Sequence, residues 1–414
     1  MKILAINSSP KPAAVSVTQR LITLFANHNP DISFDTISVG PACGQLDREP
    51  ELRQEWLEAV RAAGAVIWTF PVYYLWLPSQ LVRFLELVRR SPEWCAALAG
   101  KPATAVTTSF NFFDHTAHAV IRESAEDLGM PWYPGYSAAM DQLLRKQGRE
   151  DALAFCRGFS AAVAAGRFLP RLTAPPLAHR GTLPAAGPHA DKSAGRRVTL
   201  LTDARPEDRS LALMIETFVL ASPDHVEVIN IRDIGLKGGC LGCCRCGWDN
   251  TCTYRDGFKE FLLAKCAPAD GLVYAWRTEG RGFSSLQKAF SDRSFVFNHV
   301  PFLKGKKAVW LVDGPLSRLA TLEELTRSSA ELGGLYLAGI VSNEHEPEML
   351  TRGLAAAAAE MHQAIGENRQ PARTFREVAG RKLFRDFVWL GGIFRNDHRY
   401  YKKAGFYDFP QKRW

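Results

Sequence analysis

Short apolar segments that suit buried strands alternate with amphipathic segments along most of this 414-residue chain. The alternation runs to about residue 166, stops, and begins again at residue 197. Such a pattern predicts parallel sheets with helices on both faces, because each crossover between parallel strands needs a connection long enough for a helix. The sequence therefore predicts two α/β units related by an internal repeat.

The repeat also sets the predicted domain boundaries. In the first copy we expect strands at 2–6, 33–37, 65–70 and 103–108, and helices at 50–62, 78–90, 115–128 and 150–165. In the second copy we expect strands at 197–202, 225–231, 271–276, 307–313 and 335–342, and helices at 208–221, 256–267, 284–296, 318–332 and 346–366. Between the copies, Pro, Ala and Gly are dense and apolar periodicity is lost, which is typical of a linker. We therefore predict domains at 1–168 and 197–368, a linker at 169–196 and a C-terminal extension at 369–414.

The polar loop after the first strand, residues 7–18, has the composition of an anion site. It leads from the end of a strand into a helix, where free backbone N–H groups and the helix dipole favour a phosphate. Its hydroxyl and ammonium groups come from Ser8, Ser9, Lys11, Ser16 and Thr18. Ser16 is equally suited to be only the N-cap of the helix. The loop by itself therefore leaves phosphate binding open.

Two further loops at the same predicted edge are unusually aromatic, PVYYLWLP at 71–78 and SFNFF at 109–113. Ligands of doubly wound sheets bind beyond the carboxyl ends of the strands. Planar side chains beside a phosphate site suit a planar ring such as the isoalloxazine of FMN. Any single ring is better explained by packing in the core or at an interface, but as a set beside a phosphate loop they favour a flavin. The candidate flavin contacts in these loops are Pro71, Val72, Tyr73, Tyr74, Leu75, Trp76, Ser109, Phe110 and Asn111.

The corresponding loop of the second copy is acidic. It carries Asp203, Glu207 and Asp208, whose carboxylates would repel a phosphate dianion. We therefore expect FMN in the first domain and little or none in the second.

Five of the nine cysteines lie within thirteen residues, Cys240, Cys243, Cys244, Cys246 and Cys252. In a chain without secretory features, this density indicates metal binding or catalysis rather than disulfides. Four of them read C-x2-C-x2-C-x5-C, which suits one loop wrapped around a 4Fe-4S cluster, whereas structural zinc usually joins two separate C-x2-C units. We take Cys240, Cys243, Cys246 and Cys252 as the metal ligands, with a 4Fe-4S cluster favoured over zinc. A redox or structural thiol group is the third interpretation.

Charge and hydropathy limit the partners. The net charge is +8 and the pI about 9.0, but no nucleic-acid-binding motif accompanies them, so we expect no nucleic-acid partner. No run of eighteen apolar residues occurs and the first residues are too short for a signal-peptide core. We therefore expect a cytoplasmic protein without a membrane span.

The tail, residues 370–414, mixes basic and aromatic side chains. We expect its aromatic residues to pack across the two domains or against a dimer partner. Contact with a membrane surface is the alternative, because Trp, Phe, Lys and Arg mix in this way in interfacial helices.

Together these motifs resemble the iron–sulfur flavoproteins of the flavodoxin-like, NAD(P)H-dependent FMN reductase superfamily. The similarity covers about 1–166 and 197–366 and leaves the tail unexplained. It lies in the loop NSSPKPAAVSVT, in the P-x-Y of residues 71–73, in the compact cysteine motif and in a K-x-F-x-D-R helix pattern. That helix pattern comprises Lys288, Phe290, Asp292 and Arg293.

The resemblance implies two tandem flavodoxin-like, doubly wound parallel sheets that form a pseudo-dimer. It implies FMN phosphate contacts from the loop at 7–18 and a 4Fe-4S cluster on the four cysteines. The implied function is that of a redox flavoprotein passing electrons between FMN and the cluster. NAD(P)H, another small molecule or a protein would be the electron donor or acceptor, and the chain would form a homodimer. The alternatives are an FMN or quinone reductase with a structural zinc site, and a non-enzymatic scaffold or sensor on a degenerate flavodoxin fold.

Overall fold

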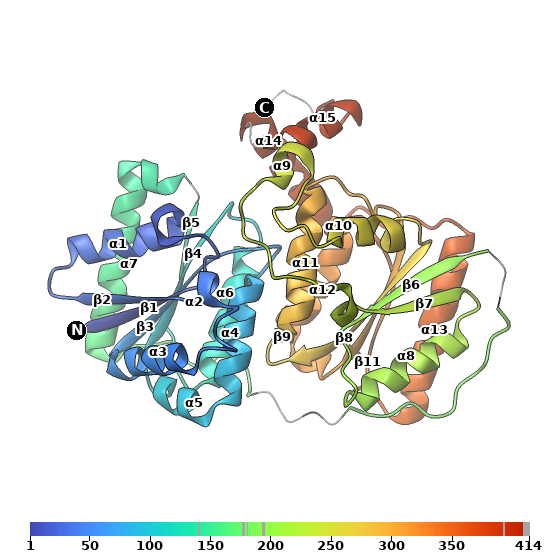
Figure 1. Ribbon diagram of the computed structural model, residues 1–414, viewed down its shortest axis with the longest axis horizontal. Coiled ribbons are helices and arrows are strands. Elements are labelled where there is room, and N and C mark those ends of the chain that lie inside the picture. Colours follow the sequence, from blue (N-terminus) through green and yellow to red (C-terminus); the bar gives the residue numbers. More distant parts are fainter. Residues whose placement is uncertain (140, 176–178, 180, 193–194, 392–393, 409–414) are drawn as a thin grey trace. The chain divides into compact units, whose positions relative to one another are not determined.

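The computed structural model describes residues 1–414 except 140, 176–178, 180, 193–194, 392–393 and 409–414 (Figure 1). The described chain forms two compact units. The first comprises residues 1–177, 238–242 and 279–292, and the second comprises 178–237, 243–278 and 293–414. Two segments that the repeat assigns to the second copy, 238–242 and 279–292, thus belong to the first unit.

The first unit is built on a parallel sheet of five strands in the order β2-β1-β3-β4-β5. The strands are β1 (Lys2–Asn7), β2 (Ser33–Ser38), β3 (Ala65–Pro71), β4 (Ala103–Ser109) and β5 (Tyr136–Ala139). The pairing register places Ile3 of β1 opposite Phe34 of β2 on one side and opposite Ala65 of β3 on the other. The order 2-1-3-4-5 is that of the flavodoxin-like doubly wound fold, which confirms the predicted fold class.

Helices cover both faces of this sheet. They are α1 (Val17–His28), α2 (Val39–Ala42), α3 (Pro50–Ala62), α4 (Ser79–Arg90), α5 (Pro92–Leu98), α6 (Asp114–Asp127) and α7 (Lys146–Ala165). Successive residues of β3 point to opposite faces. Ile67 packs with Phe25 of α1 and Phe159 of α7, whereas the ring of Trp68 lies 6.4 Å from that of Phe84 in α4. Both faces are therefore sealed by apolar side chains, and polar ligands are left with the sheet edges.

The second unit repeats this plan. Its sheet has the order β11-β10-β8-β6-β7, with β9 paired to β8 outside that order. The strands are β6 (Arg197–Thr202), β7 (His225–Asn230), β8 (Gly271–Glu279), β9 (Gly282–Phe283), β10 (Lys307–Asp313) and β11 (Tyr336–Ser342). Counted along this copy, the parallel strands again have the order 2-1-3-4-5. Both predicted α/β units are therefore present, with one topology.

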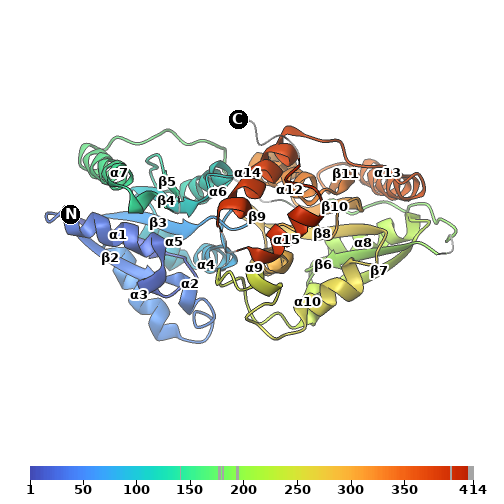
Figure 2. The ribbon, with the colours of Figure 1, turned by 90° about the horizontal axis from the view of Figure 1, so that it is seen from above.

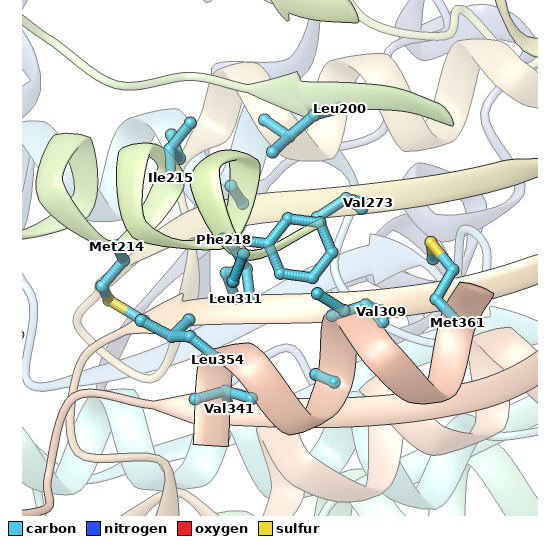
Figure 3. Packing of buried hydrophobic residues seen from close by; sticks show 14 of the residues in the cluster. Leu200, Met214, Ile215, Phe218, Val273, Val309, Leu311, Val341, Leu354 and Met361 are labelled. Carbon is cyan, nitrogen blue, oxygen red and sulfur yellow. The ribbon is translucent and has the colours of Figure 1, made fainter. Parts of the chain in front are cut away.

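The core of the second unit lies between its sheet and two helices (Figure 3). Phe218 of α8 (Arg209–Ala221) packs against Val309 and Leu311 of β10, with Leu354 and Met361 of α13 (Pro347–Gly366) alongside. The remaining helices of this unit are α9 (Cys246–Asp249), α10 (Phe258–Phe261), α12 (Ala320–Gly333), α14 (Phe375–Gly391) and α15 (Arg395–Lys403), and Leu262–Cys266 form a π-helical turn. Strand β9 and most of helix α11 (Ser285–Ser294) fall within the second copy in sequence but belong to the first unit.

The C-terminal extension folds onto the second unit as α14 and α15. Val388, Phe394 and Tyr401 form a small core, and Tyr400 and Phe406 pack against it. Helix α15 lies beside α9 in both views (Figure 2). The described aromatic residues of the extension thus pack within one unit, and their packing across the two domains or against a dimer partner stays a prediction. Among the described residues, no helix is both long and apolar enough to cross a membrane.

Candidate functional site

Two buried hydroxyl groups mark the carboxyl edge of the first sheet. The backbone N–H of Ser8, after β1, donates to the carbonyl of Thr69 in β3 at 2.8 Å. The side-chain oxygens of both residues are buried without a hydrogen-bond partner among the described residues. Leaving a buried hydroxyl unsatisfied costs about 1–3 kcal/mol, so the pair indicates a site that a polar ligand completes. The prediction included Ser8 and missed Thr69, whose only signal is its place near the end of a buried strand.

The rest of the loop is organised by its own side chains. Asn7 Oδ1 accepts from the Ser9 N–H at 3.1 Å and from the Thr18 hydroxyl at 3.2 Å. Ser16 Oγ accepts from Gln19 N at 3.3 Å and lies 2.8 Å from Thr18 Oγ1, so Ser16 is the N-cap of α1. Phosphate contacts from Ser9, Ser16, Thr18 and the half-buried Lys11 stay predictions.

The loop at 71–78 turns back tightly on itself. Tyr73 N donates to Trp76 O at 2.9 Å, and Trp76 N donates to Tyr73 O at 3.2 Å. Between them Tyr74 and Leu75 have φ values of 39° and 75°. A left-handed backbone at a non-glycine residue costs about 1–3 kcal/mol and is found mainly at functional sites. Burial raises the pKa of Tyr74 to about 12, so its phenol stays protonated near neutral pH.

The loop at 109–113 has a similar conformation. Asn111 and Phe113 have φ values of 55° and 57°, and Asn111 N donates to Ser109 Oγ at 2.8 Å. Phe113 is buried and its ring centroid lies 4.8 Å from that of Phe112, whereas Phe110 is exposed. Phe113 therefore belongs to the core, and Phe110 is the aromatic side chain of this loop that remains accessible to a ligand.

A buried cation from the distant segment 279–292 supports the aromatic loop at 71–78. Lys288 is fully buried, forms an ion pair with Asp292, and donates from Nζ to the carbonyl of Tyr73 at 2.8 Å. The same Nζ lies 5.7 Å from the ring centroid of Trp76. Burial lowers the pKa of Lys288, and the Asp292 carboxylate opposes that shift. The K-x-F-x-D-R pattern thus supplies a donor to the loop that was predicted to border the flavin.

The helices on either side of this ion pair cap each other. Asp292 Oδ2 of α11 accepts from Ser79 N at the start of α4, at 3.0 Å. In return, the buried Glu86 of α4 accepts from Ser285 N at 2.6 Å and from its hydroxyl at 2.8 Å, at the start of α11. Helix α4 has no cap of its own, because Pro78 occupies its N-cap position. An N-cap interaction contributes about 0.5–2 kcal/mol, so α4 depends on α11 for its cap. Helix α11 also has a cap of its own, because Ser284 Oγ accepts from Gln287 N at 3.1 Å.

The first part of the cysteine loop lies in the same unit, against the aromatic loop. Gln80 Nε2 donates to Cys240 O at 3.2 Å. A Cβ on Gly242, whose φ is 61°, would lie 1.8 Å from the hydroxyl oxygen of Tyr73. Only glycine fits there, so the loop passes directly over Tyr73.

The other cysteines belong to the second unit. Burial, together with nearby Cys243, Cys244 and Cys252, raises the pKa of Cys246 to about 12. Yet nowhere in the described part of the chain do three or more His, Cys, Asp or Glu side chains have an arrangement that could hold a metal ion. The thiols are neighbours without the geometry of a metal site, and ligation by Cys240, Cys243, Cys246 and Cys252 stays a prediction.

The carboxyl edge of the second sheet is filled by its own polar groups. Asp313 accepts from the Ser210 hydroxyl at 2.7 Å and from Asn343 Nδ2 at 2.6 Å. Asn343 Oδ1 accepts from Gly314 N at 2.9 Å and lies 2.8 Å from His179 Nε2. A Cβ on Gly181 would lie 2.1 Å from Asn343 Nδ2. Residues of the predicted linker thus occupy this edge, and little or no flavin in the second domain stays a prediction.

A comparison with known families bears on the first sheet. Residues 1–143 match the NADPH-dependent FMN reductase family. This match covers about a third of the chain and includes Ser8, Thr69 and the loops at 71–78 and 109–113. It supports an FMN-binding, NAD(P)H-dependent oxidoreductase fold for this part of the chain.

Solved structures and curated proteins add little to that match. General stress protein 14 from Treponema denticola, in complex with FMN, is 13% identical over 40% of this chain and 97% of its own, with a TM-score of 0.30. The flavoenzyme FerB from Paracoccus denitrificans is 13% identical over 41% of this chain and 99% of its own, with a TM-score of 0.32. Among curated proteins, none matches the chain.

Proposed function

We propose that the protein is an oxidoreductase that holds FMN at the carboxyl edge of its first sheet and takes electrons from NAD(P)H. A small molecule such as a flavin or a quinone would be the acceptor. The observation that carries this proposal is the pair of unsatisfied buried hydroxyls, Ser8 and Thr69. They lie at the edge where doubly wound sheets bind ligands, within the stretch that matches the FMN reductase family.

The residues of this edge have separate roles in the proposal. Ser8 and Thr69 would donate to oxygen atoms of the phosphate or ribityl chain, and Lys11 would add a positive charge. Tyr73, Tyr74 and Phe110 would border the ring and exclude water. Bound FMN would supply the redox chemistry itself. Because the phenol of Tyr74 stays protonated, it can donate a hydrogen bond but cannot act as a base near neutral pH.

We further propose that Cys240, Cys243, Cys246 and Cys252 ligate a 4Fe-4S cluster that exchanges electrons with FMN, with zinc as the alternative metal. Support comes from the density of the cysteines, from the thiols near Cys246, and from the contact between Gly242 and Tyr73. The described thiols do not form a metal site, so we assign no electron-transfer step to them. A homodimer and a cytoplasmic location complete the proposal.

Anaerobic purification followed by analysis of FMN, iron, sulfide and zinc per chain tests both parts. About one FMN per chain, reduced by NADPH or NADH, would support the oxidoreductase. About four iron and four sulfide would support the cluster, whereas zinc would make the cysteine loop structural. Failure to retain FMN after reconstitution would contradict the oxidoreductase and favour the scaffold alternative.

A further inference from the structure

Helix α14 has an exposed apolar face. Its largest exposed side chains are Phe375 at 87% and Leu390 at 84%, followed by Trp389 at 55%, Val378 at 39% and Leu383 at 36%. At 3.6 residues per turn these positions fall on one side of the helix. The exposed Asp386 lies on the same side. The opposite side of the helix packs against the rest of its unit, because Glu377 and Val388 are buried. The helix therefore has one face packed on its unit and one apolar face in contact with water.

The rest of the extension is anchored within the second unit. The Thr374 hydroxyl donates to Glu331 of α12 at 2.8 Å, and Asn396 Nδ2 donates to Asn250 Oδ1 at 2.6 Å. The guanidinium of Arg395 lies 4.2 Å from the ring centroid of Trp248. These contacts hold α14 and α15 in place. Within the apolar face, Trp389 also packs inside the extension, with its ring centroid 4.8 Å from that of Tyr407. The face is therefore part of the folded unit and not of a loose tail.

Nearly all of the chain's excess positive charge lies in the same segment. Residues 370–414 contain eleven Lys and Arg against four Asp and Glu, a net charge of +7 out of +8 for the whole chain. Lys382 is exposed within the apolar face, and Arg373, Lys402 and Lys403 are exposed nearby in sequence. The excess positive charge of the sequence is therefore concentrated in the C-terminal extension.

We propose that the exposed face of α14, with the basic residues of the extension, binds the surface of a membrane that contains anionic lipids. Trp, Phe and Leu on one face and Lys and Arg around them are the composition of helices that lie in the plane of a lipid–water interface. Anionic head groups attract such clusters of basic residues. A second copy of the chain fits less well, because pairing two α14 faces would bring two segments of net charge +7 together.

Sedimentation with lipid vesicles tests the proposal on the full-length protein. We expect binding to vesicles of phosphatidylcholine mixed with phosphatidylglycerol, weakened by added salt, and little binding to phosphatidylcholine alone. The double variant Trp389→Ala, Leu390→Ser should lower the vesicle partition coefficient by about tenfold or more, since apolar area is lost from the inserted face. The double variant Lys402→Glu, Lys403→Glu should also lower it, and only for anionic vesicles.

Leu144→Ser is the matched control, because Leu144 is 83% exposed but lies in the first unit. It should bind vesicles like the unchanged protein. Because all the substituted side chains are exposed, circular dichroism and FMN content should not change. Equal binding by the Trp389 and Leu390 variant would overturn the proposal. The proposal would also be overturned if the unchanged protein bound no vesicles but formed a dimer, and if the Trp389 and Leu390 variant dissociated that dimer. The exposed face of α14 would then join two copies of the chain.

Discussion

The two sheets have the same strand order, but their carboxyl edges differ. At the first edge, the Ser8 and Thr69 hydroxyls are buried without partners, and two loops contain residues in the left-handed region. At the second edge, Asp313 and Asn343 bond to each other and to groups of the same unit. The same strand order therefore accompanies one edge with unsatisfied hydroxyls and one edge where Asp313 and Asn343 are hydrogen-bonded within the chain. The difference lies in which polar groups the chain itself satisfies.

The largest effect is expected at the buried cation that supports the first edge. Lys288→Met should destabilise the protein by about 3–5 kcal/mol, because Asp292 is left as an unpaired buried charge. The double variant Lys288→Met, Asp292→Leu should recover much of that loss. Urea unfolding measures both. If the single and double variants were equally destabilised, the ion pair would not be the cause.

The next effect concerns ligand binding at the first edge. Ser8→Ala and Thr69→Val should each weaken FMN binding by about tenfold to a hundredfold, since a hydrogen bond to a charged group contributes about 1.5–3 kcal/mol. The flavin-free protein should keep its stability or gain some, because each change removes an unsatisfied hydroxyl. Fluorescence titration with FMN and thermal unfolding of the apoprotein give the two readings. Unchanged FMN affinity would place the flavin elsewhere.

The opposite result is expected at the second edge. Asn343→Leu should leave FMN affinity unchanged and should destabilise the protein by about 1–3 kcal/mol, since Asp313 Oδ1 loses the Asn343 amide donor and Gly314 N loses its acceptor. The same titration and unfolding measurements apply. A second FMN bound by the unchanged protein, and lost in this variant, would show that the second edge is also a flavin site.

The smallest effect is a dependence on alkaline pH. The pKa of Tyr74 is raised from an ordinary value of 10 to about 12. Its stabilising contribution is therefore complete below pH 10 and is lost as pH rises towards 12, because the unfolded chain releases the phenolic proton first. Tyr74→Phe should reduce this loss. Comparison of the unfolding free energy of both proteins at alkaline pH would show it, and identical curves would exclude Tyr74 as its source.

Sequence periodicity was sufficient to predict most of the strands, because a buried parallel strand is a short, continuous run of apolar residues. It missed β5, which has only four residues, Tyr136–Ala139, and lacks an apolar run. The loops of the first edge were predictable because they follow strands. The hydrogen bond from Lys288 to the Tyr73 carbonyl was not predictable, since it joins residues 215 positions apart. Thr69 was missed because an unsatisfied hydroxyl is visible only when its surroundings are known.

The reciprocal caps between α4 and α11 bear on how the chain is made. The helices of the first sequence copy end with α7 at Ala165, but Ser79 N obtains its carboxylate from Asp292. A ribosome must therefore add 127 more residues before α4 is capped and the loop at 71–78 receives its donor. At 5–20 residues per second this delay is about 6–25 s. During that time the nascent first domain would have to persist with an incomplete flavin site.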